Sequence, residues 1–386
     1  MKCCLIQGIK NNCLTKKDST MTLKREFTEL LKGCTPVKDS DGNIIVQSIM
    51  NMQVVCLTTD DEFSLDDRFA NPMENVFASN RNYGQISFTN ENEKEVIMPA
   101  QVAVMTKQRA QNHGMIKAGY LPAYSEKTYN DAGCVQGSQT GHFSNTNEYR
   151  IIPVAMREML FDKINKEGGF DRIYSAINHL GSQTQSRTNN YLDVYFNQYD
   201  KKLEEFIAHF ERPNKFIGVV IFIDGEIVAI DKFPSFTYAE QVWDVMIRDC
   251  YGALAVISEL KDKKSRKVFG DVFSEVKSKS IGVSIAELLE TSLKQTKKQI
   301  TDSVRGKIED FLDVEFDAEL DHNGNNGSEK CKSYVLKSEG YVGQVISESG
   351  LNHLVSIVKR DSFDPNALRR VNELRKKARK QNKFTL

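Results

Sequence analysis

The 386-residue sequence lacks a long apolar run, and no stretch of about 18 uncharged apolar residues occurs that could form a membrane-spanning helix. The opening MKCCLIQGIKNNC is interrupted by Gln7 and Gly8, so its apolar run is too short for a secretory signal. We therefore expect a cytoplasmic protein with no membrane contact.

The common signatures of nucleotide and metal chemistry are also missing. There is no Walker loop, no G-x-G-x-x-G, no G-x-S-x-G, no H-E-x-x-H and no EF-hand loop. The eight cysteines are dispersed, without a C-x-x-C pair or a Cys/His cluster at zinc spacing. These absences predict reduced, mostly structural thiols, and they give no reason to expect a metal or another cofactor.

Net charge is absent as well, because 52 Lys and Arg balance 52 Asp and Glu. The whole chain therefore has no electrostatic preference for nucleic acid or acidic membranes. The charge is uneven near the end, where Arg369 to Lys383 carries eight basic residues and the single acid Glu373. We expect a basic terminal helix there, which either is solvated or contacts a polyanion or protein partner. The oligomeric state stays open.

The hydrophobic patterns that are present predict an α+β fold, with mostly antiparallel strands and several long helices. Strand-like runs fill the interval from Asn43 to Met105, and Asp224-Gly225 joins two apolar runs in a hairpin. The composition from Met115 to Asn147 is typical of long loops. Helical spacing recurs over Val154–Lys166, Phe170–Leu180, Tyr191–Phe210, Thr237–Leu260 and Ser284–Leu312, and strand runs return after the loop Asp321–Ser328.

These patterns divide the chain into three parts. Residues 1–42 are predicted to be an N-terminal appendage, a short strand followed by a helix over Thr22–Leu31. Residues 43–363 form the main α+β domain, with a helical insertion around 284–313. Residues 364–386 make the basic C-terminal helix or tail.

Two polar segments are the first candidates for chemistry. Lys107, Gln108 and Arg109 follow the apolar strand QVAVM, where two cations and an amide can hold a phosphate or carboxylate unless they simply end the strand in solvent. The glycine-rich segment Gly133–His142 contains Cys134, Gln139 and His142. Such a loop can bring backbone N–H groups near an oxyanion, with Cys134 or His142 as nucleophile or base, although an isolated Cys is commonly structural.

Three further positions carry open alternatives. Ser182, Gln183 and Thr184 precede the Tyr191 helix, so they either contact a ligand or cap that helix. Asp231 ends the second hairpin strand and is a candidate general base or metal ligand, or else pairs with Lys232 or caps the next helix. His353 lies in a predicted strand, where we favour a structural role.

The order of these motifs resembles the family described as ARG and rhodanese-phosphatase-superfamily-associated protein. The resemblance spans roughly Asn43 to Phe363, and two positions depart from it: Arg109-Ala110 stands where Asn-Arg is usual, and Gln136 where an acid is common. The motifs that carry it are Lys107-Gln108, Cys134-Val135 through Gly141-His142-Phe143, Ser182-Gln183-Thr184, Gly218 and Gly225 through Asp231-Lys232-Phe233, the Trp243–Tyr251 helix, and His353-Leu354.

This resemblance implies a link to NAD and ADP-ribose metabolism or conflict systems, and a ligand that carries phosphate and ribose. In one hypothesis the protein processes such a nucleotide: Lys107 and Arg109 hold phosphate, and Gln108, Gln139 and Gln183 orient the sugar or base. His142 or Asp231 then moves a proton. In the other hypothesis the same pocket binds a nucleotide or partner without turnover, as a sensor, sponge or scaffold.

Overall fold

The computed structural model describes nine continuous segments and part of one further helix. The segments are residues 22–49, 52–60, 68–108, 110–137, 140–162, 169–223, 225–262, 314–321 and 326–360, and the helix is described at residues 302, 304–309 and 311. The basic tail, the predicted helix Ser284–Leu312 except for its end, and residues 1–21 lie outside the described part.

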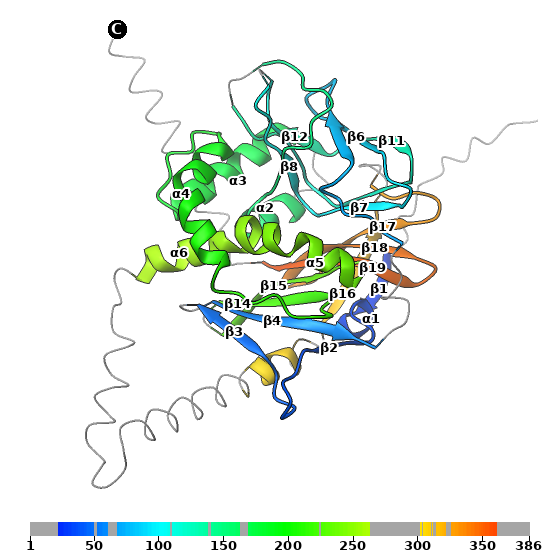
Figure 1. The fold of residues 1–386 in the computed structure, drawn as a ribbon, viewed down its shortest axis with the longest axis vertical. Coiled ribbons are helices and arrows are strands. Elements are labelled where there is room, and N and C mark those ends of the chain that lie inside the picture. The colour runs from blue at the N-terminus through cyan, green and yellow to red at the C-terminus, as the bar shows by residue number, and fades with distance from the viewer. Residues whose placement is uncertain are drawn as a thin grey trace, which may run out of the picture.

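A ten-stranded antiparallel sheet forms the base of the molecule (Figure 1). Its order is β1-β16-β17-β18-β19-β15-β14-β4-β2, and β3 pairs with β4 beside β2. The strands are β1 Thr22–Glu26, β2 Cys34–Pro36, β3 Val46–Ile49, β4 Met52–Thr59, β14 Gly218–Ile223, β15 Glu226–Lys232, β16 Glu315–Leu320, β17 Lys332–Lys337, β18 Tyr341–Glu348 and β19 Leu351–Lys359.

Both faces of the large sheet are buried around β14, which explains why that strand is apolar without interruption. Along β14, Val219 and Ile221 join the core on the helix side, while Val220 and Phe222 join the core on the opposite side. Successive side chains of a strand point to opposite faces, so a strand covered on both faces needs apolar residues at every position.

Three smaller antiparallel sheets form the upper layer in Figure 1. The interval expected to consist of long loops, Met115–Asn147, contains short strands of these sheets, so the loop prediction is wrong there. Strands of three residues are too short to show a period, and the five-residue strand Ser125–Tyr129, SEKTY, has no apolar alternation, so their pairing comes from tertiary contacts. The strands are β5 Val76–Ser79, β6 Ile86–Asn90, β7 Val96–Met98, β8 Val102–Val104, β9 His113–Met115, β10 Gly119–Leu121, β11 Ser125–Tyr129, β12 Ala132–Cys134 and β13 Tyr149–Ile151.

A long helical segment separates the two layers. The predicted helix Thr237–Leu260 is present as α5 Phe236–Val245, a π-helical turn η3 Met246–Tyr251, and α6 Gly252–Asp262, and it crosses the middle of Figure 1. Ser235 begins it by accepting a hydrogen bond from the N–H of Tyr238 at 3.2 Å. Further helices elsewhere in the fold are α1 Phe27–Leu30, η2 Val154–Met156, α2 Arg157–Asp162, α3 Gly169–Gln183 and α4 Leu192–Ile207.

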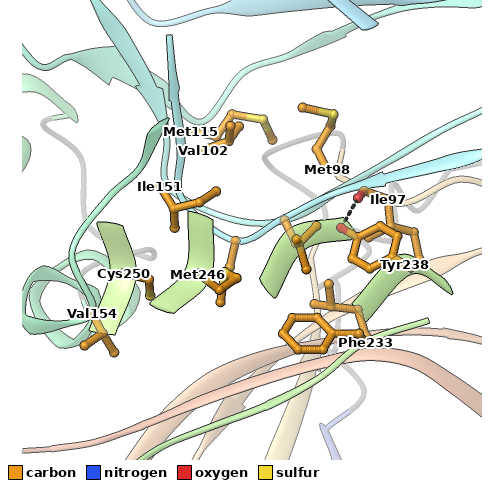
Figure 2. Close-up of a cluster of buried hydrophobic side chains, with 14 of the residues drawn as sticks. Ile97, Met98, Val102, Met115, Ile151, Val154, Phe233, Tyr238, Met246 and Cys250 are labelled. Atoms are coloured by element: carbon orange, nitrogen blue, oxygen red, sulfur yellow. Dashed lines mark hydrogen bonds between the residues drawn. The ribbon is translucent and has the colours of Figure 1, made fainter. Parts of the chain in front are cut away.

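The central core is packed between the layers, around α5. Figure 2 shows Tyr238 between Phe233 of the lower layer and Ile97 of the upper layer, with its hydroxyl donating to the Ile97 carbonyl at 2.6 Å. Met246 and Cys250, one turn apart on the π-helical segment, are buried near Ile151. The two layers therefore share one apolar interior.

Two tight turns set strand register in the large sheet. The predicted hairpin at Asp224-Gly225 is confirmed: β14 and β15 pair antiparallel, and Gly225 has φ +76°. A second two-residue turn, Ser349-Gly350, joins β18 to β19 with φ values of +50° and +84°. Positive φ at both positions is the geometry of a type I′ hairpin, which Gly adopts without strain.

The α+β class is confirmed, and the N-terminal prediction needs correction. Residues Thr22–Glu26 form an edge strand paired with β16, and only Phe27–Leu30 are helical. Phe27 and Leu30 are buried in the core on the outer face of the large sheet. The segment expected to be an appendage is thus built into the main sheet over its described part. None of the described helices is long and apolar enough to cross a membrane.

Candidate functional site

A cleft of about 820 Å³ opens at the ends of the interior strands β15, β18 and β19, where the β18–β19 turn meets α1. Its floor contains Lys232, whose ammonium donates to the Asn352 carbonyl at 2.5 Å. Asn352 in turn donates to the Glu29 carbonyl at 3.0 Å, which ties α1 to β19. The wall is partly apolar and partly charged: Leu30, Phe69, Pro234 and Leu351 lie with Glu29, Lys32, Arg68, Glu348 and His353.

A β-bulge places His353 in the wall of this cleft. Ile346 pairs with Leu354 and Ser347 pairs with Asn352, so His353 is the extra residue of β19. A bulge residue has no direct partner across the ladder, and its side chain is turned out of the regular alternation. The imidazole packs edge-to-face on Phe69, with ring centroids 5.1 Å apart.

Arg68 connects the charged side chains of the same wall. Its guanidinium donates to Glu95 and to Glu348, and its Nη2 lies 4.0 Å from the sulfur of Cys331. Lys330 adds a second cation, 3.2 Å from Glu95. The Tyr120 hydroxyl donates to Glu95 at 2.8 Å. Two carboxylates and two cations therefore form one partly buried network.

Burial and this network set the protonation states. Burial lowers the pKa of His353 to about 4, assisted by the positive charges of Arg68 and Lys232, so the imidazole is neutral near pH 7. Burial raises the pKa of Cys331 to about 11, and nearby Glu348 acts in the same direction. Burial opposes ionisation of Glu348, but the hydrogen bond from Arg68 and the positive charges of Arg68 and Lys330 together outweigh it and hold the pKa of Glu348 below its ordinary value.

The predicted residues Lys107 and Gln108 lie elsewhere, in the upper layer after β8. Lys107 is fully in solvent and lies 3.4 Å from Glu148. The Gln108 side chain exchanges two hydrogen bonds with the backbone of Ser144, at 2.9 and 3.2 Å. Gln108 thus fastens the segment that carries His142. Arg109 and Gln139 lie outside the described residues.

Cys134 also lies in the upper layer, and its histidine neighbour is His113 rather than His142. Cys134 Sγ is 3.6 Å from His113 Nε2, across the β9–β12 ladder. Both nitrogens of His113 also face backbone carbonyls: Nδ1 is 2.8 Å from the Gln111 carbonyl, and Nε2 is 3.2 Å from the Tyr83 carbonyl. His142 is exposed and packs beside Tyr83, with ring centroids 5.7 Å apart.

The Cys134–His113 pair is closed to solvent. Cys134 is 2% exposed and His113 is 0% exposed. Burial raises the pKa of Cys134 to about 11 and lowers the pKa of His113. Cys134 and His113 are therefore in contact as a neutral thiol and a neutral imidazole, and a neutral thiol is a weak nucleophile.

The Ser182-Gln183-Thr184 segment ends α3 and does not cap the next helix. Ser182 donates to the His179 carbonyl at 2.7 Å, and Thr184 donates to the Leu180 carbonyl at 2.8 Å. The next helix, α4, has Tyr191 at its N-cap position without a side-chain cap. The capping alternative is therefore wrong, because these hydroxyls satisfy carbonyls of their own helix.

Asp231 is buried on the helix side of the sheet, where it pairs with Arg157 rather than with Lys232. Arg157 Nη1 lies 2.8 and 2.7 Å from its two carboxylate oxygens, and the Tyr251 hydroxyl donates to the same group. Ser235, not Asp231, caps α5. The two alternatives to a catalytic role, pairing with Lys232 and capping, are thus wrong, while neighbouring Lys232 points to the opposite face and into the cleft.

None of the described predicted site residues lines the cleft. Sequence reasoning did not select Arg68, Lys232, Cys331 or Glu348, and it gave His353 a structural role. The one available signal was the polar segment around the Ser349-Gly350 turn, which marks a hairpin end but not its neighbours. Arg68 and Glu348 meet through tertiary contact between positions 280 residues apart.

A family model matches residues 45–343 and carries the description ARG and Rhodanese-Phosphatase-superfamily-associated Protein domain. The chain belongs to this family. The family match includes Arg68, Lys232 and Cys331, and it ends before Glu348 and His353. No curated protein and no solved structure matches the chain.

Proposed function

We propose that the protein binds a nucleotide of the ADP-ribose or NAD type in the cleft between α1 and the β18–β19 turn. The observation that carries this is the convergence of Lys232, from the Asp231-Lys232-Phe233 motif, with His353 and Arg68 in one cavity. A volume of about 820 Å³ lies within the range of small-molecule sites.

The lining suits a ligand with one apolar and one anionic part. Phe69, Leu30 and Pro234 offer a surface for a base, and Lys32 and Lys232 offer ammonium groups for a phosphate. Arg68 contributes less charge, because Glu95 and Glu348 already compensate it. The link to phosphate and ribose comes from the family resemblance, and the cleft supplies matching size and chemistry.

Titration calorimetry with ADP-ribose, NAD⁺, ADP and AMP tests this proposal. Lys32 is exposed on the rim, so Lys32→Glu leaves the fold intact and places a negative charge near the phosphate. We expect roughly tenfold weaker binding. Lys107→Glu makes the same charge change at an exposed residue outside the cleft and is expected to bind like wild type. A loss caused by Lys107→Glu alone would place the ligand in the upper layer and overturn the cleft assignment.

A second candidate function is turnover of the nucleotide at the Cys134–His113 contact of the upper layer, where a thiol lies beside an imidazole. Its burial argues for binding without reaction, because substrate does not reach the sulfur in the described conformation. Chromatography of the ligand after incubation distinguishes the two: intact recovery supports binding, and cleavage that disappears in Cys134→Ser supports turnover.

A further inference from the structure

Three metal-ligating side chains converge beside the cleft, and two of them line it. Cys331, Glu348 and His353 each offer one ligand atom, and these atoms all lie within 4.8 Å of one another. Ligand atoms around a tetrahedral Zn²⁺ are roughly 3.5 Å apart, given bonds of about 2.0 to 2.3 Å. Contraction by about one ångström through side-chain rotation would bring the three to bonding distance of one ion.

A buried, unsatisfied nitrogen points to a ligand at this place. His353 is 7% exposed, and its Nε2 has no hydrogen-bond partner among the described residues, although Glu348 Oε2 lies 3.4 Å away. A buried polar atom without a partner costs free energy and calls for an explanation such as an ion. An imidazole nitrogen is a common ligand of transition metals in proteins, and this one faces the thiol and the carboxylate of the same cluster.

We propose that Cys331, Glu348 and His353 bind a divalent transition metal of the Zn²⁺ class. A thiolate, an imidazole and a carboxylate are the ligand types that zinc uses in proteins, and three protein ligands leave a fourth position for water or for a group in the cleft. Glu348 and His353 line the cleft directly, which gives the ion an entry path. The site does not depend on the proposed nucleotide and is tested without it.

Arg68 acts as the competing cation at this site. Its guanidinium donates a hydrogen bond to Glu348 and lies near the sulfur of Cys331, so it competes with the metal for these two ligands. When the metal binds, the Cys331 S–H bond breaks, a sulfur–metal bond forms, and the proton leaves to solvent. Glu348 passes from Arg68 to the metal, while Arg68 keeps its pairing with Glu95. Metal binding is thus expected to weaken as pH falls.

The test uses Co²⁺ on the full chain after EDTA treatment, because a Co²⁺–thiolate bond absorbs in the near ultraviolet. A background variant with Cys3, Cys4 and Cys13 changed to Ser removes the N-terminal thiols that would also bind Co²⁺. We expect a single equivalent of Co²⁺ with a thiolate band, and Zn²⁺ should displace it and raise the melting temperature. Cys331→Ser should abolish the band, and His353→Gln should weaken affinity by more than roughly 100-fold.

Two further variants separate metal binding at this cluster from binding at other thiols and from loss of structure. Cys34→Ser removes a half-buried thiol outside the cluster and should bind Co²⁺ like its parent. Arg68→Gln removes the competing cation and should tighten Co²⁺ binding by roughly tenfold, an increase that general loss of structure cannot produce. Absence of Co²⁺ binding, or an unchanged band in a folded Cys331→Ser protein, would overturn the proposal.

Discussion

Arg157 and Asp231 form an ion pair in the interior, with the Arg157 Nη1 atom 2.7 Å from one carboxylate oxygen and both side chains almost completely buried. The pair joins α2 to β15, and Tyr251 of the π-helical turn donates to the same carboxylate. A family-motif residue predicted to be catalytic thus holds the helical layer to the sheet.

Removal of this carboxylate should destabilise the protein strongly. Asp231→Ala leaves the Arg157 guanidinium buried without a counter-charge, and we expect a loss of about 3 to 5 kcal/mol in the free energy of unfolding, measured by urea denaturation. Asp200 is the control, because it is exposed and its partner Arg150 keeps a second carboxylate, Asp249, so that Asp200→Ala should cost less than about 1 kcal/mol. Similar losses of unfolding free energy in the two variants would refute the interpretation that Asp231 holds the helical layer to the sheet.

The buried imidazole of His353 predicts a pH dependence of stability. Its pKa is about 4 in the folded chain against an ordinary value of 6.5. As pH falls from about 6.5 to 4, the unfolded chain binds a proton that the folded chain does not, so stability is lost, by about 3 kcal/mol in total. Urea unfolding in EDTA across this range measures it, and His353→Gln should remove this part of the slope.

The quantity to compare is the difference in the free energy of unfolding between wild type and His353→Gln, because Asp131 has the opposite pH dependence. Burial raises the pKa of Asp131 to about 7, so its folded form binds more protons and it loses stability as pH rises over the same range. Because Asp131 is present in both proteins, it cancels in the difference. A pH-independent difference would contradict the neutral, buried state of His353.

Gly350 should be the more sensitive of two turn glycines that have open space around them. A Cβ atom at Gly350 would meet no atom within 4 Å, but its φ of +84° is unfavourable for any other residue. Gly350→Ala should therefore cost about 1 kcal/mol through the backbone alone. Gly340 is equally open and has no positive φ, so Gly340→Ala should change the urea midpoint little. Equal effects would argue against a type I′ turn at the cleft.

Thiol labelling should separate Cys134 from Cys34. Cys134 is buried with a pKa of about 11, and Cys34 is half-buried in the short edge strand β2. We expect iodoacetamide at pH 7.5 to modify Cys34 first and Cys134 only after unfolding, with mass spectrometry of the peptides as the measurement. Rapid labelling of native Cys134 would instead favour the nucleophilic function.

Local pattern was sufficient for the larger elements of the fold. The Asp224-Gly225 hairpin and the Tyr191–Phe210 helix were predictable because turn chemistry and apolar spacing act over a few neighbouring residues. The short strands between Met115 and Asn147 were not, because they have three residues or, in β11, five residues without apolar alternation, and neither establishes a period. Thr22–Glu26 was misassigned for a related reason, since its strand form depends on pairing with β16, almost 300 residues later.

The sequence by itself determined the α+β class, the central hairpin and the family, because each depends on ordered local motifs. Only the tertiary structure decided which polar groups meet. Cys134 faces His113, Asp231 faces Arg157, and His353 reaches Glu348 and Cys331 because a bulge and a two-residue turn set the β18–β19 register. Such contacts join residues through sheet pairing and layer packing, and these long-range interactions leave no spacing in the sequence from which they can be read.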